Sequence, residues 1–214
     1  MKILATAAFA TALAFAGTAA NAADIVGLYN TGVDNGGTQL AEGASDTHYV
    51  VNGTGTPVVY TNALYVSDPS AKFIAVAPGG GYTNPVNTYT LDFDLSGYDI
   101  ATASLSGQFA ADNFGTVELN GHLLTSLSGT LFENFEQLHP FSATAADFVA
   151  GMNTLTFTIT DTGPPSAFMV ADLVGTADVL GAVPEPATWA MFLLGFFGLG
   201  MMARARQDRV ASAA

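Results

Sequence analysis

Two pairs of carboxylates have the spacing that acid–base catalysis or cation binding would need. Asp92 and Asp94 lie two residues apart in a predicted strand, so their side chains share one face. Glu133 and Glu136 flank an Asn-Phe dipeptide. A glycoside hydrolase places two carboxylates beside its scissile bond, and Ca²⁺ takes about six to eight oxygen ligands. Further oxygens could come from four other acidic residues: Asp34, Asp46, Asp68 and Asp172.

These pairs predict neither a glycosidase nor a calcium site, because a chain with 18 Asp and Glu residues contains such pairs by chance. The three histidines, His48, His122 and His139, are scattered, whereas a zinc site needs three or four convergent ligands. The chain has no cysteine and no Gly-x-Ser-x-Gly sequence. We therefore predict a protein that is not an enzyme and has no cofactor, with the metal left open and calcium as the ion to test.

The distribution of charge excludes one class of partner. Between Ala23 and Val183 the only basic residue is Lys72, against sixteen Asp and Glu residues, a net charge of about −15. Phosphate backbones and anionic lipid headgroups both require a basic surface. A nucleic-acid partner is therefore excluded, and the charge is expected to keep an exported domain soluble or to attract divalent cations.

The N-terminus has the pattern of a secretory signal peptide. Lys2 precedes an apolar run over residues 3–16, and an Ala-x-Ala site follows at Ala20 and Ala22. We expect signal peptidase to cut after Ala22, with Ala23 as the alternative, so residues 1–22 are the signal peptide.

The C-terminus combines three features in a fixed order. A linker over residues 181–186 contains a proline-rich motif made of Val183, Pro184, Glu185 and Pro186. Residues 187–203 carry no charge and are just long enough for a transmembrane helix, with Trp189 at its interfacial end. The basic tail, residues 204–214, would stay in the cytoplasm by virtue of three arginines: Arg204, Arg206 and Arg209.

This tail resembles the PEP-CTERM sorting signal, in which the same three parts occur in the same order at the chain end. The resemblance implies recognition by an exosortase, which processes the tail near the motif. It also implies a Gram-negative host, an inner-membrane intermediate, and a final place at the cell surface or in an extracellular matrix linked to exopolysaccharide and biofilm. The alternative is a plain C-terminal membrane anchor.

The sequence pattern of residues 23–180 predicts an all-β ectodomain. In 87–95 and in 154–160 apolar residues alternate with Thr and Asp, as in half-buried strands. Asn120-Gly121 predicts a tight hairpin, and residues 143–150 predict one helical turn. Four further strands are expected: 103–109, 116–119, 138–143 and 167–174. Many short strands at regular intervals favour a β-sandwich, followed by a single hydrophobic helix at the C-terminus.

The segment 110–121, with its Ala-Asp-Asn and Val-Glu-Leu-Asn-Gly sequences, resembles galactose-binding-like jelly rolls of exported bacterial proteins, as do Phe141 and residues 151–157. The resemblance implies a fold more than a ligand. Asn113 and Asn120 are interpreted as turn residues. We expect a structural or interaction role, with extracellular polysaccharide as a partner.

The alternative function is a carbohydrate-binding module, calcium-dependent or not. Such modules usually present exposed aromatic platforms, yet the only tryptophan, Trp189, lies in the tail. The aromatic residues that remain on predicted loops are Tyr29, Tyr82 and Phe114.

Overall fold

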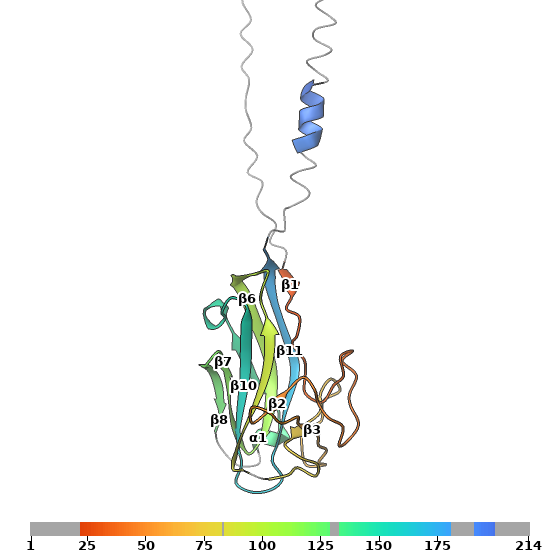
Figure 1. Ribbon diagram of the computed structural model, residues 1–214, viewed down its shortest axis with the longest axis vertical. Helices are drawn as coiled ribbons and strands as arrows, with labels where there is room; N and C mark the ends of the chain where they lie inside the picture. The colour runs from red at the N-terminus through yellow and green to blue at the C-terminus, as the bar shows by residue number, and fades with distance from the viewer. Residues whose placement is uncertain (1–21, 83, 129–132, 181–190, 200–214) are drawn as a thin grey trace, which may run out of the picture. The chain divides into compact units, whose positions relative to one another are not determined.

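The computed structural model describes residues 22–82, 84–128, 133–180 and 191–199. Residues 21–180 form one compact unit, separate from a second unit that comprises the two chain ends. The sandwich of Figure 1 is the first of these units.

The two most regular sequence patterns form the centre of one sheet. Strands β5 (Val86–Asp94) and β10 (Met152–Thr160) pair antiparallel, with Leu91 opposite Leu155 and Tyr89 opposite Phe157. These apolar side chains are buried, while the threonines between them lie on the solvent side. The alternation predicted for both segments is confirmed, because one face of the sheet is covered and the other meets water.

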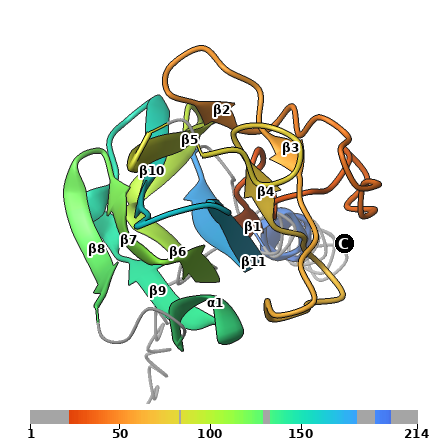
Figure 2. The ribbon, with the colours of Figure 1, turned by 90° about the horizontal axis from the view of Figure 1, so that it is seen from below.

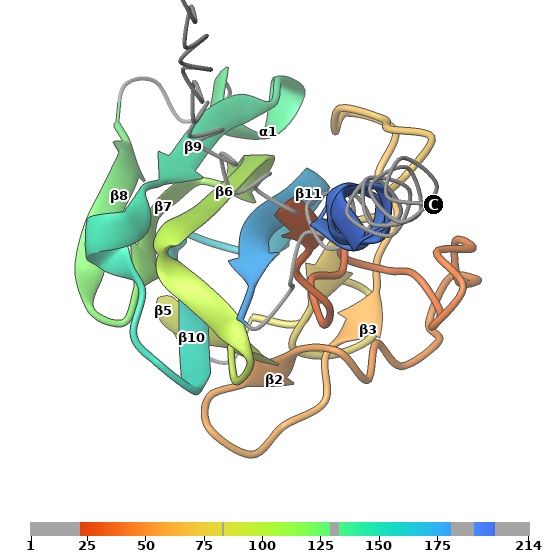
Figure 3. The same cartoon turned by 90° about the horizontal axis from the view of Figure 1, so that it is seen from above.

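Strands of two antiparallel sheets face each other (Figures 2 and 3). The five-stranded sheet has the order β2 (Val50–Val51), β5, β10, β7 (Phe114–Leu119) and β8 (His122–Leu127). The six-stranded sheet has the order β3 (Val58–Val59), β4 (Ile74–Ala75), β11 (Ala167–Val179), β6 (Tyr98–Asp112) and β9 (His139–Ala143), with β1 (Ala22–Asp24) also beside β11. From β5 onward the chain passes back and forth between the sheets, as jelly rolls do. The predicted all-β sandwich is confirmed.

Strand β11 has a hydrophobic cluster on each of its faces. Phe168 and Val170 point into the core between the sheets, where Phe168 packs against the rings of Tyr89 and Phe157 at centroid distances of 4.4 and 5.2 Å. Ala167, Met169 and Ala171 alternate with them and so lie on the outer face of the sheet. There they form a second cluster with residues of the β3–β4 connection, of β4 and β6, and of the helical turn at 133–136: Tyr65, Ala71, Phe73, Ala75, Ala110 and Phe135.

The predicted helical turn is present as a single 3₁₀ turn over Ala145–Asp147. Helix α1 (Glu133–Glu136) and strands β2, β3 and β4 were not predicted. Each of the three strands is two residues long, too short for an alternating pattern to be recognised. Most of the structure between residues 25 and 85 was therefore not predicted.

Residues 191–199, all apolar or glycine, are helical. The rest of the predicted transmembrane segment 187–203 lies outside the described residues, so its full length stays a prediction. Within the described ranges, no helix is long and apolar enough to cross a membrane.

Candidate functional site

Six of the acidic residues considered as cation ligands accept separate local hydrogen bonds, whereas Glu133 and Glu136 are the first and last residues of α1. Asp92 accepts a hydrogen bond from the Thr154 hydroxyl at 2.6 Å, and Asp172 accepts one from the Gln108 amide at 2.8 Å. Hydrogen bonds from Ser96 hold the pKa of the Asp94 carboxyl below its usual value.

Three further carboxylates stabilise loops. Asp34 accepts from the backbone of Gly36 and Thr38, and Asp68 accepts from Ser70. Asp46 is fully buried and accepts from the Gly32 amide at 2.7 Å, and this burial raises the pKa of its carboxyl. Among the residues that the structure describes, no three His, Asp or Glu side chains are placed to hold a metal ion together.

The histidines lie on separate elements. His48 stacks on Tyr29 at a centroid distance of 3.7 Å, and its ring lies 3.5 Å from the Asp46 carboxylate. His122 begins β8, where it approaches Asp147, and His139 begins β9. One face of the Tyr29 ring is therefore covered by His48.

Asn120 and Asn113 have different roles. Asn120 and Gly121 adopt φ angles of 53° and 81° between β7 and β8, which confirms the predicted hairpin. Asn113 was also interpreted as a turn residue, and it forms the bend between β6 and β7, where it is buried in a polar network. Its side-chain oxygen accepts from Thr162 at 2.9 Å, and its backbone carbonyl accepts from Asn134 at 2.7 Å.

Asp112 is the acidic centre of this network. Its carboxylate accepts hydrogen bonds from the hydroxyl of Tyr65 and the side-chain amide of Asn113. Burial raises the pKa of Asp112 to about 6, against the lowering effect of the Tyr65 hydrogen bond, and nearby Asp161 adds to the rise. The network connects the end of β6 with α1, with the loop after β10 and, through Tyr65, with the chain between β3 and β4. Its members are too far apart in sequence to be recognised beforehand.

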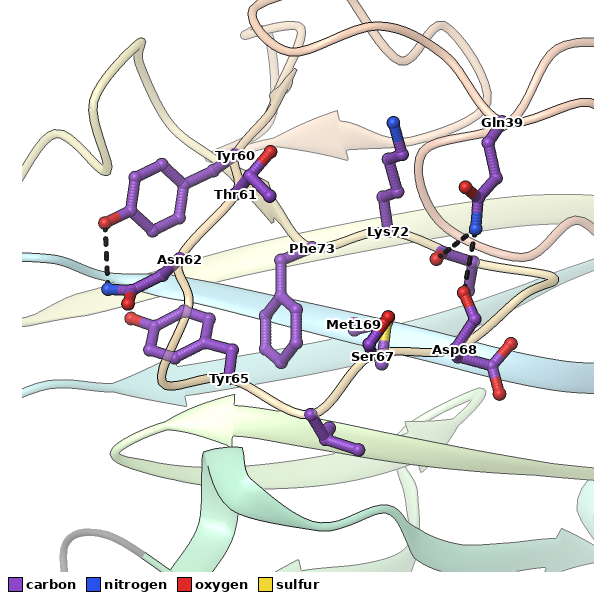
Figure 4. A pocket seen from close by; sticks show the side chains of 12 residues that line it. Gln39, Tyr60, Thr61, Asn62, Tyr65, Ser67, Asp68, Lys72, Phe73 and Met169 are labelled. Carbon is purple, nitrogen blue, oxygen red and sulfur yellow. Dashed lines mark hydrogen bonds between the residues drawn. The ribbon is translucent and has the colours of Figure 1, made fainter.

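A pocket of about 110 Å³ lies on the outer face of the six-stranded sheet, beneath the chain that joins β3 to β4 (Figure 4). Its apolar floor is formed by Phe73, Met169 and Tyr65, which belong to the outer hydrophobic cluster. The polar residues around this floor are Gln39, Thr61, Asn62, Ser67, Asp68 and Lys72.

Several polar side chains of this pocket are held by intramolecular hydrogen bonds. The Gln39 amide nitrogen donates to the carbonyls of Asp68 and Ala71 at 2.8 and 2.9 Å (Figure 4). The Lys72 ammonium donates to the Leu40 carbonyl at 2.7 Å, and the Asn62 amide donates to the Tyr60 hydroxyl at 3.2 Å. Apolar surface with a few fixed polar groups is typical of a small-molecule site.

None of the loop aromatics expected from the sequence lines this pocket. Tyr82 lies near the Asp161 carbonyl, and Phe114 is half-buried at the start of β7. Tyr60 and Tyr65 were not singled out, because the segment around them has no strand pattern. The one signal that could have drawn attention to this segment is Lys72, the single basic residue of the ectodomain.

Residues 182–207 match the family model of the PEP-CTERM protein-sorting motif. The chain carries a PEP-CTERM motif. This motif implies export and exosortase processing, with a membrane-anchored intermediate before sorting. Among curated proteins, none has a significantly similar sequence.

Several solved structures are similar to the chain at low identity. The apo form of a cyclase from Fischerella sp. is 12% identical, with 74% of this chain and 97% of that chain covered and a TM-score of 0.45. A family 29 carbohydrate-binding module from Piromyces equi is 7% identical, with coverage of 78% and 99% and a TM-score of 0.36. A family 35 module from Paenibacillus barcinonensis is 16% identical, with coverage of 62% and 95% and a TM-score of 0.35. Similarity at this level carries no argument about function.

Most residues of the predicted sorting and anchoring segments lie outside the described residues: Ala20, Val183, Pro184, Glu185, Pro186, Trp189, Arg204, Arg206 and Arg209. Ala22 and Ala23, at the predicted signal cleavage site, belong to β1, where they pair with Asp178 and Ala177 of β11. Strand β11 ends at Val179, three residues before the PEP-CTERM motif begins. The start and the end of the ectodomain are therefore neighbours.

Proposed function

We propose that this protein is an exported, non-catalytic surface or matrix protein of a Gram-negative bacterium. Signal peptidase would remove residues 1–22, an exosortase would process the chain near Val183–Pro186, and the sandwich would remain at the cell surface or in the extracellular matrix. There it would have a structural or interaction role linked to exopolysaccharide and biofilm. The observation that carries this proposal is the PEP-CTERM motif directly after a sandwich with its own core.

The pairing of β1 with the end of β11 supports the proposal physically. The ectodomain core is complete between these strands, so removal of both chain ends would leave its buried residues covered. A domain of this size can bury enough apolar surface to fold without disulfides.

The proposal is tested by the intact mass of the protein recovered from the surface of its own host. We expect the mass of a chain that begins at Ala23 or Asp24 and ends near Val183–Pro186. All residues after that end should be absent from this mass. The same measurement on Glu185→Ala should show retention of the tail, whereas Glu118→Ala, a change of the same type in the ectodomain, should be processed normally. Recovery of the parent chain extended to Ala214 would contradict exosortase processing and favour a permanent membrane anchor.

A carbohydrate-binding function is the second candidate. The pocket beneath the β3–β4 connection favours it, because its apolar floor and fixed polar rim suit a ligand with both apolar and hydroxylated surfaces. A calcium-dependent form of this function would give a higher melting temperature with added calcium, through binding to the folded state alone.

A further inference from the structure

We infer that the pocket formed by Tyr65, Phe73 and Met169 with the rim of Gln39 and Asn62 binds one uncharged sugar unit of a glycan. This inference rests on the carbohydrate-binding function proposed above and names its site and ligand class. It does not depend on the route by which the protein is exported.

The floor of the pocket provides a small but firm apolar contact. Phe73 and Met169 are almost fully buried, at 4% and 1% exposure, so they form a firm surface with little side-chain freedom left to lose. The rings of Tyr65 and Phe73 pack at a centroid distance of 4.6 Å, and Tyr60 packs edge-on against Tyr65. Such rigid aromatic groups give contact area at low entropic cost. A C–H edge of a sugar ring fits against this floor.

The rim provides hydrogen-bonding groups that are already oriented. The Gln39 amide nitrogen donates to two backbone carbonyls. These hydrogen bonds fix the orientation of the whole amide group before any ligand binds. Asn62 is held from both ends, since its nitrogen donates to Tyr60 and its oxygen accepts from the Leu64 amide at 3.0 Å. Beside these amides, the Thr61 hydroxyl is fixed by donating to the Glu42 carboxylate, and Ser67 adds an exposed hydroxyl. Preorganised groups lower the cost of ordering on binding.

The size of the pocket limits the ligand. About 110 Å³ is well below the roughly 300–1,000 Å³ of typical small-molecule sites, so a glycan chain cannot lie in it lengthwise. One sugar unit could insert an edge while the rest of the chain stays in solvent. The β3–β4 connection lies at the opposite end of the sandwich from β1, as Figure 1 shows, so the ectodomain's own termini leave the pocket open.

The charges favour a neutral ligand. Lys72 is the one cation of the ectodomain, and Asp68 lines the same pocket. The remaining carboxylates give the ectodomain a net charge of about −15, which would repel an acidic polysaccharide at low ionic strength. Binding of an uncharged unit should therefore be nearly independent of salt.

The test is calorimetric titration of the full chain, in a detergent without a sugar headgroup, with neutral oligosaccharides of hexose and N-acetylhexosamine units. An oligosaccharide of uronic acids with the same number of units is titrated in the same way, as the negatively charged comparison. Ser67→Arg should weaken binding of the neutral ligand at least tenfold, because Ser67 is exposed at the rim and the larger side chain would fill the pocket. Asn62→Ala should weaken it several-fold.

The matched control is Ser126→Arg, the same change at an exposed position of β8 in the other sheet. It should bind like the parent chain, and all variants should keep the parent's melting temperature within about two degrees. Equal affinity of Ser67→Arg and the parent chain would overturn the site. Binding of the uronic acid oligosaccharide alone, or of no oligosaccharide at all, would overturn the ligand class. Correct processing at the host surface would still leave the proposed export route intact.

Discussion

At the scale of single residues, several aspartates that resembled cation ligands stabilise loops and strands through local hydrogen bonds. Asn153 is the clearest example of a polar side chain that stabilises the fold, since it is completely buried in β10. Its amide donates to the carbonyls of Val149 and Gly151, both at 2.8 Å, and its oxygen accepts from the Val149 amide and the Asn120 side chain. The Asn in the Gly-x-Asn-Thr-Leu sequence thus satisfies buried polar groups that would otherwise destabilise the sandwich.

The Asp112 carboxyl should make stability depend on pH. Its pKa is raised from 3.8 to about 6 by burial, so between these values the folded chain holds a proton that the unfolded chain has lost. Stability therefore falls as pH rises through this window. Asp46 and Asp161, whose pKa values are also raised by burial, act in the same direction. We expect a melting temperature a few degrees higher at about pH 5 than at about pH 7.5.

Two variants assign this dependence to Asp112. Asp112→Asn should raise the melting temperature at neutral pH and flatten the profile. Tyr65→Phe removes the hydrogen bond that lowers the Asp112 pKa, so its profile should shift to higher pH. Calorimetric scans from about pH 4 to 8 measure both, and an Asp112→Asn profile parallel to that of the parent chain would assign the effect to other groups.

At the scale of elements, close approach between strands depends on Gly175 in β11. A Cβ atom at this position would lie 2.8 Å from the Leu28 side chain and 2.9 Å from the backbone oxygen of Ser104. The Ser104 oxygen belongs to β6, the central partner of β11, and cannot move away without disturbing the sheet. Gly175 therefore lets the chain that follows β1 pack onto the six-stranded sheet.

We expect Gly175→Ala to lower the free energy of unfolding by about 2 kcal/mol, as overpacking usually does. Urea denaturation of the two chains measures the difference. Gly163→Ala is the matched control, because a Cβ there would meet nothing within 4 Å, and its effect should stay within about 0.5 kcal/mol. Equal stability of both variants would mean that β11 and the chain after β1 adjust their spacing freely.

At the scale of the whole molecule, charge is divided unevenly between the sandwich and the C-terminal tail. The ectodomain carries nearly all of the negative charge, and three of the five basic residues lie in the tail. This asymmetry is what would orient the chain across a membrane, because arginines after an apolar segment are retained in the cytoplasm.

Replacement of Arg204, Arg206 and Arg209 by Ala should reduce correct insertion and so leave most of the protein with an unprocessed tail. Replacement of the same three residues by Lys keeps the charge and should restore processing if orientation alone is required. Immunoblots of membrane and surface fractions, with antibodies against the ectodomain and the last residues, distinguish the forms. Normal processing of the alanine variant would show that these arginines are dispensable.

The sequence by itself determined the sorting motif, the sandwich fold and the charge of the ectodomain. Each of these is encoded by residues close together in the chain: the proline motif and the apolar and basic residues after it, the alternation in 87–95 and 154–160, and the composition. Only the tertiary structure decided where the buried Asp112 network and the pocket lie. Gln39, Phe73 and Met169 come together because a chain with scarcely any regular strand crosses the outer face of β11, and such packing leaves no periodic pattern in the sequence.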